Sequence, residues 1–554
     1  MFSTTLADAT VSLIPLWIVA GYLVLLVALG ALSSRFFRGT SADFFVASRS
    51  IGPVLLLMSL FGTTMTAFSL VGSTGKAFDQ GIGVYGLMAS WSGLVHSAVF
   101  FFVGIRLWAI GKRHGYVTQI QYFRARYDSS LIGYLLFPAL VALVIPYLLM
   151  GLLSAAGVMS GITGGMFPEF FASTGGAIPR WATGLIISVV VLSYVFTGGV
   201  RAAAWANTFQ TVIFMITGVV AFYLIAQTLG GLQAASEMVA QNSGEHLARE
   251  GQFGQMQFWS YMFIPLSVGM FPHVFQHWLT ARSAKTFRLA VIAHPIFILI
   301  VWAPCILVGI WAAGLVETGA LPADLRANQV LGVMVEQLIE SPILAGILVV
   351  GILAAIMSSL DSQFVCMGTM FTNDVVVRVV GKDRFDDRQK MWLGRGFIIA
   401  VVLVTYLLSL AEPTHVFTLG VWCFTGFAGL FPLVVASLYW RRTTLPGALA
   451  CIAVTTVSCA LLFYDGLLRF TDAAQARGVS QTPWFGRIHE AGDYLVLGMM
   501  PVAIVVIVST LTLIAVSLVT KPMAAAKVAR FFPPRTLMQE QSQAEPTTVG
   551  GQSS

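Results

Sequence analysis

A stripe of serines in an apolar stretch of this sequence has the composition of a small-cation site. Residues 351–362 read GILAAIMSSLDS. On a helix, Ala355, Ser358, Ser359 and Ser362 recur at i, i+3, i+4 and i+7, which places them on one face. Hydroxyl oxygens are ligands that hard cations prefer. The stripe predicts either a cation site or serines that bond back to their own helix and pack tightly, and spacing alone leaves both interpretations open.

A second stretch, residues 61–66, reads FGTTMT and lies in the middle of another apolar segment. Glycine weakens a helix, and threonine hydroxyls compete for its backbone hydrogen bonds. The pattern predicts an unwound helix at 62–66, whose freed carbonyls can bind an ion. The alternative is a continuous helix that uses small residues for close packing. Together the two stretches would offer five oxygens, from the hydroxyls of Ser358 and Ser359 and the carbonyls at Gly62, Met65 and Ala355.

Asp361 is an ionisable residue within or near the same apolar segment. Such residues are costly in a membrane and often functional. At about 100° per residue, Asp361 points roughly 60° away from Ser358 and flanks the serine stripe. We expect either a role in coupling or a structural ion pair with a cytoplasmic arginine.

The elements that carry these residues are predicted to be membrane-spanning helices. Of the 554 residues, 57% are hydrophobic and only 10% are charged, against about 25% charged in soluble domains. The net charge of +7 does not form one basic patch, so we expect no nucleic-acid partner. Apolar segments of roughly 20 residues are long enough to cross a bilayer. We predict an all-α polytopic protein with about thirteen such segments: 12–32, 52–72, 82–110, 130–160, 181–198, 206–229, 257–280, 289–315, 342–371, 396–411, 416–440, 445–464 and 494–520.

Basic residues indicate the orientation in the membrane. One set of alternating loops carries 23 of the 31 Lys and Arg residues; it comprises 33–50, 112–129, 199–205, 281–288, 372–395, 441–444 and 521–554. The positive-inside rule makes these loops cytoplasmic. We therefore expect a multi-pass protein of the plasma or inner membrane, with its N-terminus outside and its C-terminus in the cytoplasm. The tail 521–554 is rich in Pro, Gln, Ser and Thr and is predicted to be disordered.

Several short motifs, in order along residues 40–440, resemble the sodium:solute symporter family. They are Asp43-Phe44-Phe45 with Ser48–Gly52, the interrupted second segment, Thr118–Phe123, Gly198–Ala202 with Trp205, Pro272–Gln276 with Ala281–Ala284, and Gly351 with Ala354–Gln363. Each motif is weak, but their joint order is specific. The resemblance implies a leucine-transporter-like core in which five helices, about 52–229, repeat inverted as 257–440. One helix precedes the core and two follow. The expected divisions are 1–50, 51–440, 441–520 and 521–554.

The resemblance also implies a secondary active transporter that works by alternating access. Its partners would be sodium, a small solute and the lipid bilayer, with no cofactor beyond the coupling ion. Family members bind sodium between the first and eighth core helices. Carried over by position, the ligands are the backbone oxygens of Gly62, Met65 and Ala355 and the hydroxyls of Ser358 and Ser359.

The sequence differs from the family pattern at three places, two of which bear on the number of sodium ions and on the class of solute. Many members have an acidic residue two positions after the Trp of the sixth span, where this chain has Asn207, so we expect one sodium per cycle unless Asp361 compensates. Where sugar carriers have polar residues, this chain has Ser69, Gly93 and Ile264, which disfavours a sugar because sugars need many directed hydrogen bonds. The loop Thr118–Gln121 lacks the usual Pro and acidic residue.

The expected solute site lies between the first, second, third, sixth and tenth core helices. A mostly apolar pocket with a few hydroxyls and imidazoles suits a small organic acid or amino acid, whose carboxylate could face sodium or a half-helix N-terminus. For the two histidines of this set the alternative is a packed, hydrogen-bonded side chain. The candidates are Thr64, Phe68, Ser69, Trp91, His96, Tyr147, Ser267 and His273.

Other functions make different demands on the sequence. A proton-coupled carrier would use Asp361 or a histidine as its proton site and would ignore sodium. A transporter-like sensor would act through a partner protein and show no uptake. A membrane enzyme would need a cluster such as HExxH or GxSxG, and an ATP-driven pump would need a phosphate-binding GxxxxGK[ST] loop; the sequence contains none of these motifs. We expect no enzyme.

Overall fold

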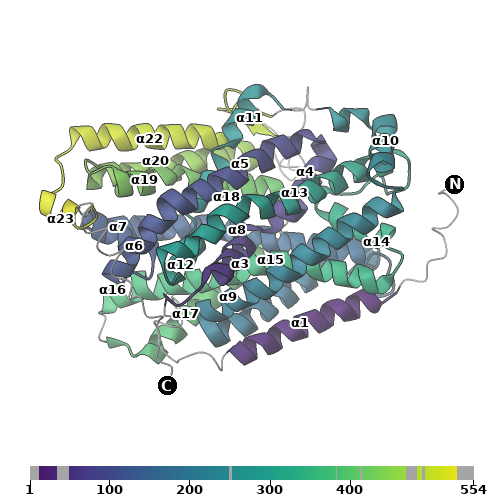
Figure 1. Ribbon diagram of the computed structural model, residues 1–554, viewed down its shortest axis with the longest axis horizontal. Helices are drawn as coiled ribbons and strands as arrows, with labels where there is room; N and C mark the ends of the chain where they lie inside the picture. Colours follow the sequence, from purple (N-terminus) through teal and green to yellow (C-terminus); the bar gives the residue numbers. More distant parts are fainter. Residues whose placement is uncertain are drawn as a thin grey trace, which may run out of the picture.

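The computed structural model describes residues 12–33, 49–248, 253–381, 384–411, 415–468, 483–488 and 493–532. Long helices lie side by side along the long axis of the molecule (Figure 1). The long helices are α1 (Ile14–Ser33), α5 (Gly83–Val99), α8 (Leu131–Ile162), α9 (Arg180–Thr228), α13 (Phe287–Glu317), α15 (Pro342–Met370), α17 (Asp387–Ser409), α18 (Val416–Gly429), α20 (Leu445–Phe463) and α22 (Pro501–Val519).

Shorter elements extend or connect these helices. The α-helices are α6 (Ile105–His114), α7 (Gln119–Tyr127), α10 (Leu232–Asn242), α14 (Val330–Leu338), α16 (Val377–Val380), α19 (Phe431–Tyr439) and α23 (Ala525–Ala529). Single turns are η4 (Phe100–Gly104), η5 (Ala172–Thr174), η6 (Gly244–Leu247), η8 (Ala284–Thr286), η9 (Ala327–Gln329), η10 (Phe371–Val376) and η12 (Tyr464–Leu468). The strands β1 (Arg487–Ile488) and β2 (Tyr494–Leu495) form an antiparallel pair.

The second predicted segment is broken, as the glycine and threonines indicated. It comprises α3 (Pro53–Thr64), then η3 (Phe68–Gly72) and α4 (Ser73–Gln80), with a bend of 56° between the two halves. The break is at 65–66, later than the predicted 62–66, because residues 62–64 complete the last turn of α3. Met65 leaves the helix with an extended backbone (ψ 91°).

The seventh predicted segment is broken too, in the matching place of the second repeat. It consists of α11 (Gln255–Tyr261), the turn η7 (Ile264–Gly269) and α12 (Pro272–Thr280). Phe271 is extended, and Pro272 has no N–H to continue the turn before it. Each half of the predicted repeat therefore begins with a discontinuous helix.

The predicted count of thirteen spans is not confirmed. Ten described helices are long and apolar enough to cross a membrane, or eleven if the bent pair is one span. The difference lies in the broken seventh segment and in α9, which joins the two predicted segments 181–198 and 206–229. The predicted loop 199–205 is helical, because its run of alanines has the highest helix propensity.

The ends of the helices gather in two groups (Figure 1). The helices α4, α10 and α14 lie toward one end, where α1 begins, and α6, α7, α16 and α23 lie toward the other. Residues 521–532, predicted to belong to the solvated tail, include α23 and the buried Phe531 and Phe532. The remainder of that tail, 533–554, and the motif residues 43–48 lie outside the described residues.

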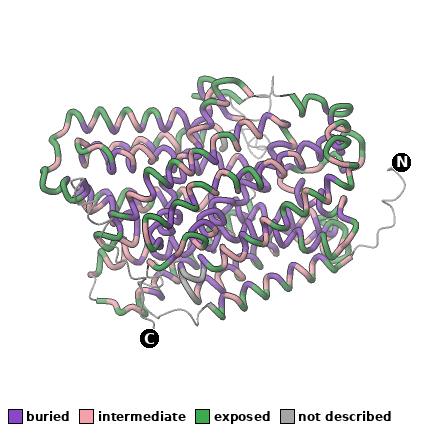
Figure 2. Tube along the Cα trace, in the orientation of Figure 1, coloured by how far each residue is buried: buried purple, intermediate pink, exposed green. Residues whose placement is uncertain are grey.

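Burial is concentrated in the middle of the bundle (Figure 2), and α15 is buried along most of its length. Large apolar side chains on outer helices are exposed, such as Trp17, Leu407 and Leu511, which suits contact with lipid. At the centre, α9 approaches α15 closely. A Cβ on Gly351 would lie 1.7 Å from Thr217 Oγ1, so only glycine permits this helix crossing.

Candidate functional site

Three uncharged oxygens meet where α3 breaks beside α15. The hydroxyl of Ser358 lies 2.7 Å from the carbonyl oxygen of Gly62 and 2.8 Å from that of Ala355. All three residues are buried. Gly62 is in the last turn of α3, where carbonyls lack intrahelical partners. The cluster is a set of neutral oxygen ligands suited to a hard cation.

Local sequence explains the break. Thr64 donates its hydroxyl to the carbonyls of Leu60 (2.8 Å) and Phe61 (3.1 Å) and so closes the last turn of α3. The hydroxyl of Thr66 accepts from the backbone N–H of Phe68 at 3.1 Å and starts the next helical stretch. A Cβ on Gly62 would lie 2.4 Å from Thr211 Oγ1 of α9, so glycine lets the end of α3 approach α9.

The other two predicted cation ligands are close in sequence but differently engaged. Ser359 donates its hydroxyl to the carbonyl of Ile356 in its own helix at 2.9 Å. Met65 is buried at the break itself. The structure therefore brings Ser358 against Gly62 of the other helix, and both Ser358 and Ser359 also bond back to their own helix, the alternative that the sequence left open.

Asp361 is fully buried and lies in a neutral polar network, not in an ion pair with any Lys or Arg that the structure describes. In the amide orientation that satisfies its neighbours, Asn207 Nδ2 donates to Asp361 Oδ1 at 2.9 Å and to the Ser358 carbonyl at 2.8 Å. Asn207 Oδ1 then accepts from Ser362 Oγ at 2.8 Å. One amide thus connects the carboxylate to the backbone of the oxygen cluster.

The network continues away from the oxygen cluster. Ser362 Oγ lies 3.1 Å from Nε2 of His277, and Nδ1 of His277 lies 2.9 Å from Ser59 Oγ. All of these side chains are buried. A chain of hydrogen bonds therefore runs from Asp361 through Asn207, Ser362 and His277 to Ser59 on α3. Nothing in the spacing of the sequence predicted His277 as a member.

A cavity of about 30 Å³ lies beside the break, with room for roughly two water molecules. It is lined by the first, second, third, sixth and tenth core helices, as expected, and also by α13 of the seventh. Six predicted solute-site residues line it, namely Thr64, Phe68, Ser69, His96, Tyr147 and Ser267. Ile264 also lines it, whereas Gly93 packs against Pro295 of α13. A solute of several atoms would have to move side chains to enter.

The two remaining candidates lie elsewhere. The indole of Trp91 packs against Phe258 and Trp259, with ring centroids 6.1 and 5.5 Å apart. Trp91 and His96 are five positions apart on α5, so their side chains point about 140° away from each other. His273 stacks on Phe271 at 5.3 Å and meets the ring of Tyr147 at 5.5 Å, behind the cavity wall.

Sequence reasoning missed part of the cavity wall. Some of these residues had a signal, because the tyrosine and proline stand at the interruption of the seventh segment, and a tryptophan inside an apolar span needs a partner for its N–H. Met65 and Thr66 belong to the break that the sequence indicated, although neither was predicted to face the solute, and the others sit in ordinary apolar patterns. The missed residues are Met65, Thr66, Ser92, Tyr261, Pro265, Phe271, Trp302 and Phe424.

A partly buried ion pair lies at the end of the bundle where α4 lies. Lys76 Nζ lies 2.5 Å from Asp493 Oδ1, with only 8% and 16% of the side chains exposed. Asp493 Oδ2 also accepts from the amides of Gln80 (3.2 Å) and Gln257 (2.8 Å). The pair lines a polar cavity of about 140 Å³ together with Asp79. It ties the second half of the broken helix, α4, to α11 and to the segment before α22.

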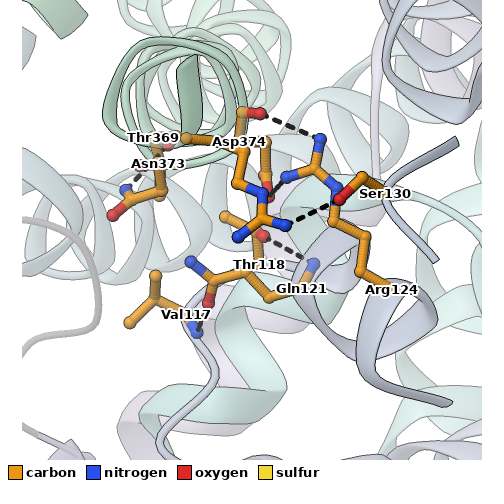
Figure 3. Close-up of polar contacts among 9 residues, drawn as sticks. Val117, Thr118, Gln121, Arg124, Ser130, Thr369, Asn373 and Asp374 are labelled. Carbon is orange, nitrogen blue, oxygen red and sulfur yellow. Dashed lines mark hydrogen bonds and ion pairs between the residues drawn. The ribbon is translucent and has the colours of Figure 1, made fainter. Parts of the chain in front are cut away.

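A second ion pair (Figure 3) lies toward the opposite end, between α7 and the segment before α16. Arg124 of α7 lies 3.4 Å from Asp374 Oδ1 of η10 and donates to the Asp374 carbonyl at 2.9 Å. Burial lowers the pKa of Arg124, and the Asp374 carboxylate opposes that shift. Arg378 donates to Ser130 Oγ at 2.7 Å.

The loop 118–121, which lacks the Pro and the acidic residue of the family pattern, lies beside the Arg124–Asp374 ion pair (Figure 3). Thr118 caps α7 by accepting from the Gln121 N–H at 3.2 Å, and Gln121 Oε1 accepts from the Val117 N–H at 2.9 Å. Gln121 thus supplies the return hydrogen bond near the start of the helix for which Glu or Gln is commonly used. The loop needs no acidic residue to form this cap.

A family model and the sequence relatives indicate one family. Residues 44–454 match the sodium:solute symporter family. The sodium/proline symporter of Escherichia coli (strain K12) is 26% identical over 424 residues, covering 74% of this chain and 80% of that protein. The sodium/proline symporter of Staphylococcus aureus (strain bovine RF122 / ET3-1) is 25% identical over 448 residues, covering 78% and 82%.

Two solved structures share the fold. A Na+-coupled sialic acid symporter in a substrate-bound outward-open state aligns with a TM-score of 0.67 at 16% identity, over 92% of this chain and 99% of the other. MHP1, a nucleobase-cation-symport-1 family transporter in a closed conformation, aligns with a TM-score of 0.50 at 15% identity, over 88% and 98%. At these identities the likeness concerns the fold alone.

Proposed function

Because the chain belongs to the sodium:solute symporter family, we propose that it carries sodium and a small organic solute across the cell membrane together, by alternating access. Sodium would bind first at the break of α3 and complete the solute site. The solute would be an amino acid or an organic acid, in keeping with the amino-acid substrate named for the sodium/proline relatives.

The single observation that carries this proposal is the position of the Ser358 hydroxyl, 2.7 and 2.8 Å from the carbonyl oxygens of Gly62 and Ala355. These oxygens come from the broken helix α3 and from α15, which belong to opposite halves of the repeat. A cation held between them would fix α3 against α15. The hydroxyl of Ser359 and the carbonyl of Met65 would complete the ligand set after small rotations.

The neighbouring cavity supports a solute site next to the ion. Thr64, Met65 and Thr66 line the cavity and belong to the same break as the proposed sodium ligands. Binding of the ion would therefore order residues that the solute touches, and the two affinities would be coupled reciprocally. An electrical gradient adds about 2.3 kcal/mol per charge per 100 mV, so one sodium per cycle gives moderate concentrating power.

Two ion pairs, each of which could hold one end of the bundle together, support alternating access. Lys76 lies on α4 and Arg124 on α7, helices that lie toward opposite ends of the bundle (Figure 1). We propose that the first end faces outside and the second faces the cytoplasm, with the N-terminus outside. The inverted-repeat core would occupy residues 51–440, preceded by 1–50 and followed by the extra helices of 441–520 and the tail 521–554.

Proton coupling is the second candidate, and the environment of Asp361 favours it. A buried carboxylate that contacts Asn207 and Ser362 and no described cation could take up a proton without breaking an ion pair. Such a carrier would work equally well when sodium is replaced. A sensor without transport would show no uptake under either condition.

The test is uptake into proteoliposomes under an inward sodium gradient, with potassium or choline as replacement ions, for amino acids and monocarboxylates. We expect sodium-dependent uptake that Ser358→Ala abolishes or weakens strongly. Ser509→Ala on α22 is the matched control, because Ser509 is also buried and back-bonded, to Val506 at 3.0 Å. Uptake that ignores sodium would refute the proposal and favour proton coupling.

A further inference from the structure

We propose that the cavity recognises a small carboxylic acid anion through two neutral hydrogen-bond donors, His96 and Trp302, and that an amino group on the solute is not required. This inference rests on the proposed function and specifies its solute class. His294, which the sequence did not single out, is the positioning residue that determines which ring nitrogen of His96 carries the hydrogen.

The two histidines form a buried pair. His96 Nδ1 lies 3.1 Å from His294 Nε2. The ring of His294 is fully buried and meets Phe61 and Phe100 edge-on, with centroids 5.4 and 5.0 Å apart. Close packing makes the pair possible, because a Cβ on Gly93, one turn before His96, would lie 3.2 Å from Pro295. Glycine therefore lets α5 approach α13 at this level.

The surroundings decide the direction of this hydrogen bond. Two neutral imidazoles share one hydrogen between the facing nitrogens. Nδ1 of His294 has no hydrogen-bond partner among the described residues, and a buried N–H without an acceptor is rare in proteins. His294 therefore keeps its hydrogen on Nε2 and donates it to His96 Nδ1. His96 must then carry its own hydrogen on Nε2, the nitrogen that remains for a ligand in the cavity.

Trp302 would supply the second donor once the cavity wall moves to admit a solute, because its Nε1 is buried in this structure. It lines the same cavity, only 3% of it is exposed, and its Nε1–H has no partner in the described part of the chain. An indole nitrogen can only donate, so an acceptor atom of the solute would satisfy it. Two hydroxyls of the cavity are already committed, because Thr64 donates to Leu60 and Phe61, and Ser92 donates to Met88 at 2.9 Å.

The charge of the cavity favours an anion paired with sodium. None of the residues that line it is Asp, Glu, Lys or Arg. An ammonium group would find no carboxylate there, whereas a carboxylate would meet two N–H donors. A cation bound at the break beside Thr64 and Met65 would balance the negative charge. The cavity of about 30 Å³ limits the solute to a few atoms unless side chains move.

A matched set of ring compounds tests the inference in the purified full-length protein in sodium. The probes are cyclopentanecarboxylate, L-proline and pyrrolidine, which carry the acid alone, both groups, and the amine alone; acetate and propionate extend the acids to smaller sizes. Titration calorimetry measures Kd. We expect the best acid without an amine to bind within a few-fold of L-proline and pyrrolidine not to bind. Binding of L-proline alone, or no binding by any acid, would overturn the inference.

Variants identify the donors. His96→Met and Trp302→Phe should each weaken binding of the acid about 10- to 100-fold, because each removes a hydrogen bond to a charged group. His96→Gln, which keeps an N–H donor, should retain more affinity than His96→Met. Trp311→Phe is the control, since Trp311 lies on the same helix and packs against Phe222 away from the cavity. Unchanged affinity in both donor variants would refute the assignment.

The outcome separates this inference from the proposed function. Stabilisation of the wild type by sodium and not by potassium reports on the cation site alone. If sodium stabilises the protein and the acids do not bind, the solute assignment fails and the coupling proposal stands. If sodium has no effect on the wild type, the proposed function fails first.

Discussion

Removal of the Lys76–Asp493 ion pair should, in the orientation proposed above, move the protein toward an outward-open state. In this structure Lys76–Asp493 is an ionic contact at the end of the bundle where α4 lies. Loss of one partner of a buried pair typically costs about 3–5 kcal/mol. The pair lines a polar cavity of about 140 Å³, where water would screen it, so we take about 2–3 kcal/mol. Lys76→Met should therefore raise the ratio of outward-open to closed protein about 30- to 150-fold.

The assay is thiol labelling from outside. Ser69 lines the central cavity, and four of the five native cysteines are buried. In a Ser69→Cys background, reconstituted protein should react with a membrane-impermeant maleimide faster when Lys76→Met or Asp493→Asn is added. The rate should rise by up to the same factor as the population ratio.

Two control variants test whether the effect on labelling depends on which end of the bundle loses its ion pair. Arg124→Met removes the pair at the other end and should slow labelling from outside, because it favours opening on the opposite side. Lys527→Met removes an exposed pair with Asp128, with 54% of the Lys527 side chain exposed, and should leave the rate within about threefold. Equal acceleration by Lys76→Met and Arg124→Met, or no change with Lys76→Met, would refute the reasoning.

Three further predictions concern the oxygen cluster and its network. Gly62→Ala should lower stability by about 1–3 kcal/mol, because its Cβ would lie 2.4 Å from Thr211 Oγ1, and Thr211→Ala should restore much of the melting temperature; equal melting of Gly62→Ala and wild type would contradict the packing. Saturating sodium, at about 100 times its Kd, should stabilise the wild type by about 2.7 kcal/mol, with a Hill coefficient near one; a coefficient near two would indicate a second sodium at Asp361 and Asn207. Asp361→Asn should leave uptake dependent on sodium if sodium alone is coupled, and a loss of pH dependence in its uptake would instead indicate a proton site there.

Much of the fold follows from local patterns in the sequence. Apolar length predicted the helices, and the glycine and threonines of residues 62–66 predicted the broken span. The period of a helix also put Ala355, Ser358, Ser359 and Ser362 on one buried face. These features depend on residues within one or two turns of each other, so neighbouring residues are enough to reveal them.

The sequence was a weaker guide to whether a helix continues through a short stretch or ends there, and so to the number of spans. The loop expected at 199–205 is helical, and the seventh segment is three short pieces instead of one span. Short polar stretches in a membrane sequence can continue a helix or end it. The difference depends on whether neighbouring helices satisfy the freed backbone groups, which one segment does not reveal.

The sequence by itself determined which residue types the sites contain, and the tertiary structure decided which of them meet. His96 and Trp91 are equally plausible on α5, yet only His96 lines the cavity, because Gly93 lets that face approach α13. His294, Trp302 and Asp493 come from segments far along the chain. Their roles depend on the rotation and crossing of whole helices, which close contacts such as Gly62 with Thr211 and Gly351 with Thr217 fix. Helical periodicity gives each helix its faces, but only packing against the other helices selects the face that becomes the site.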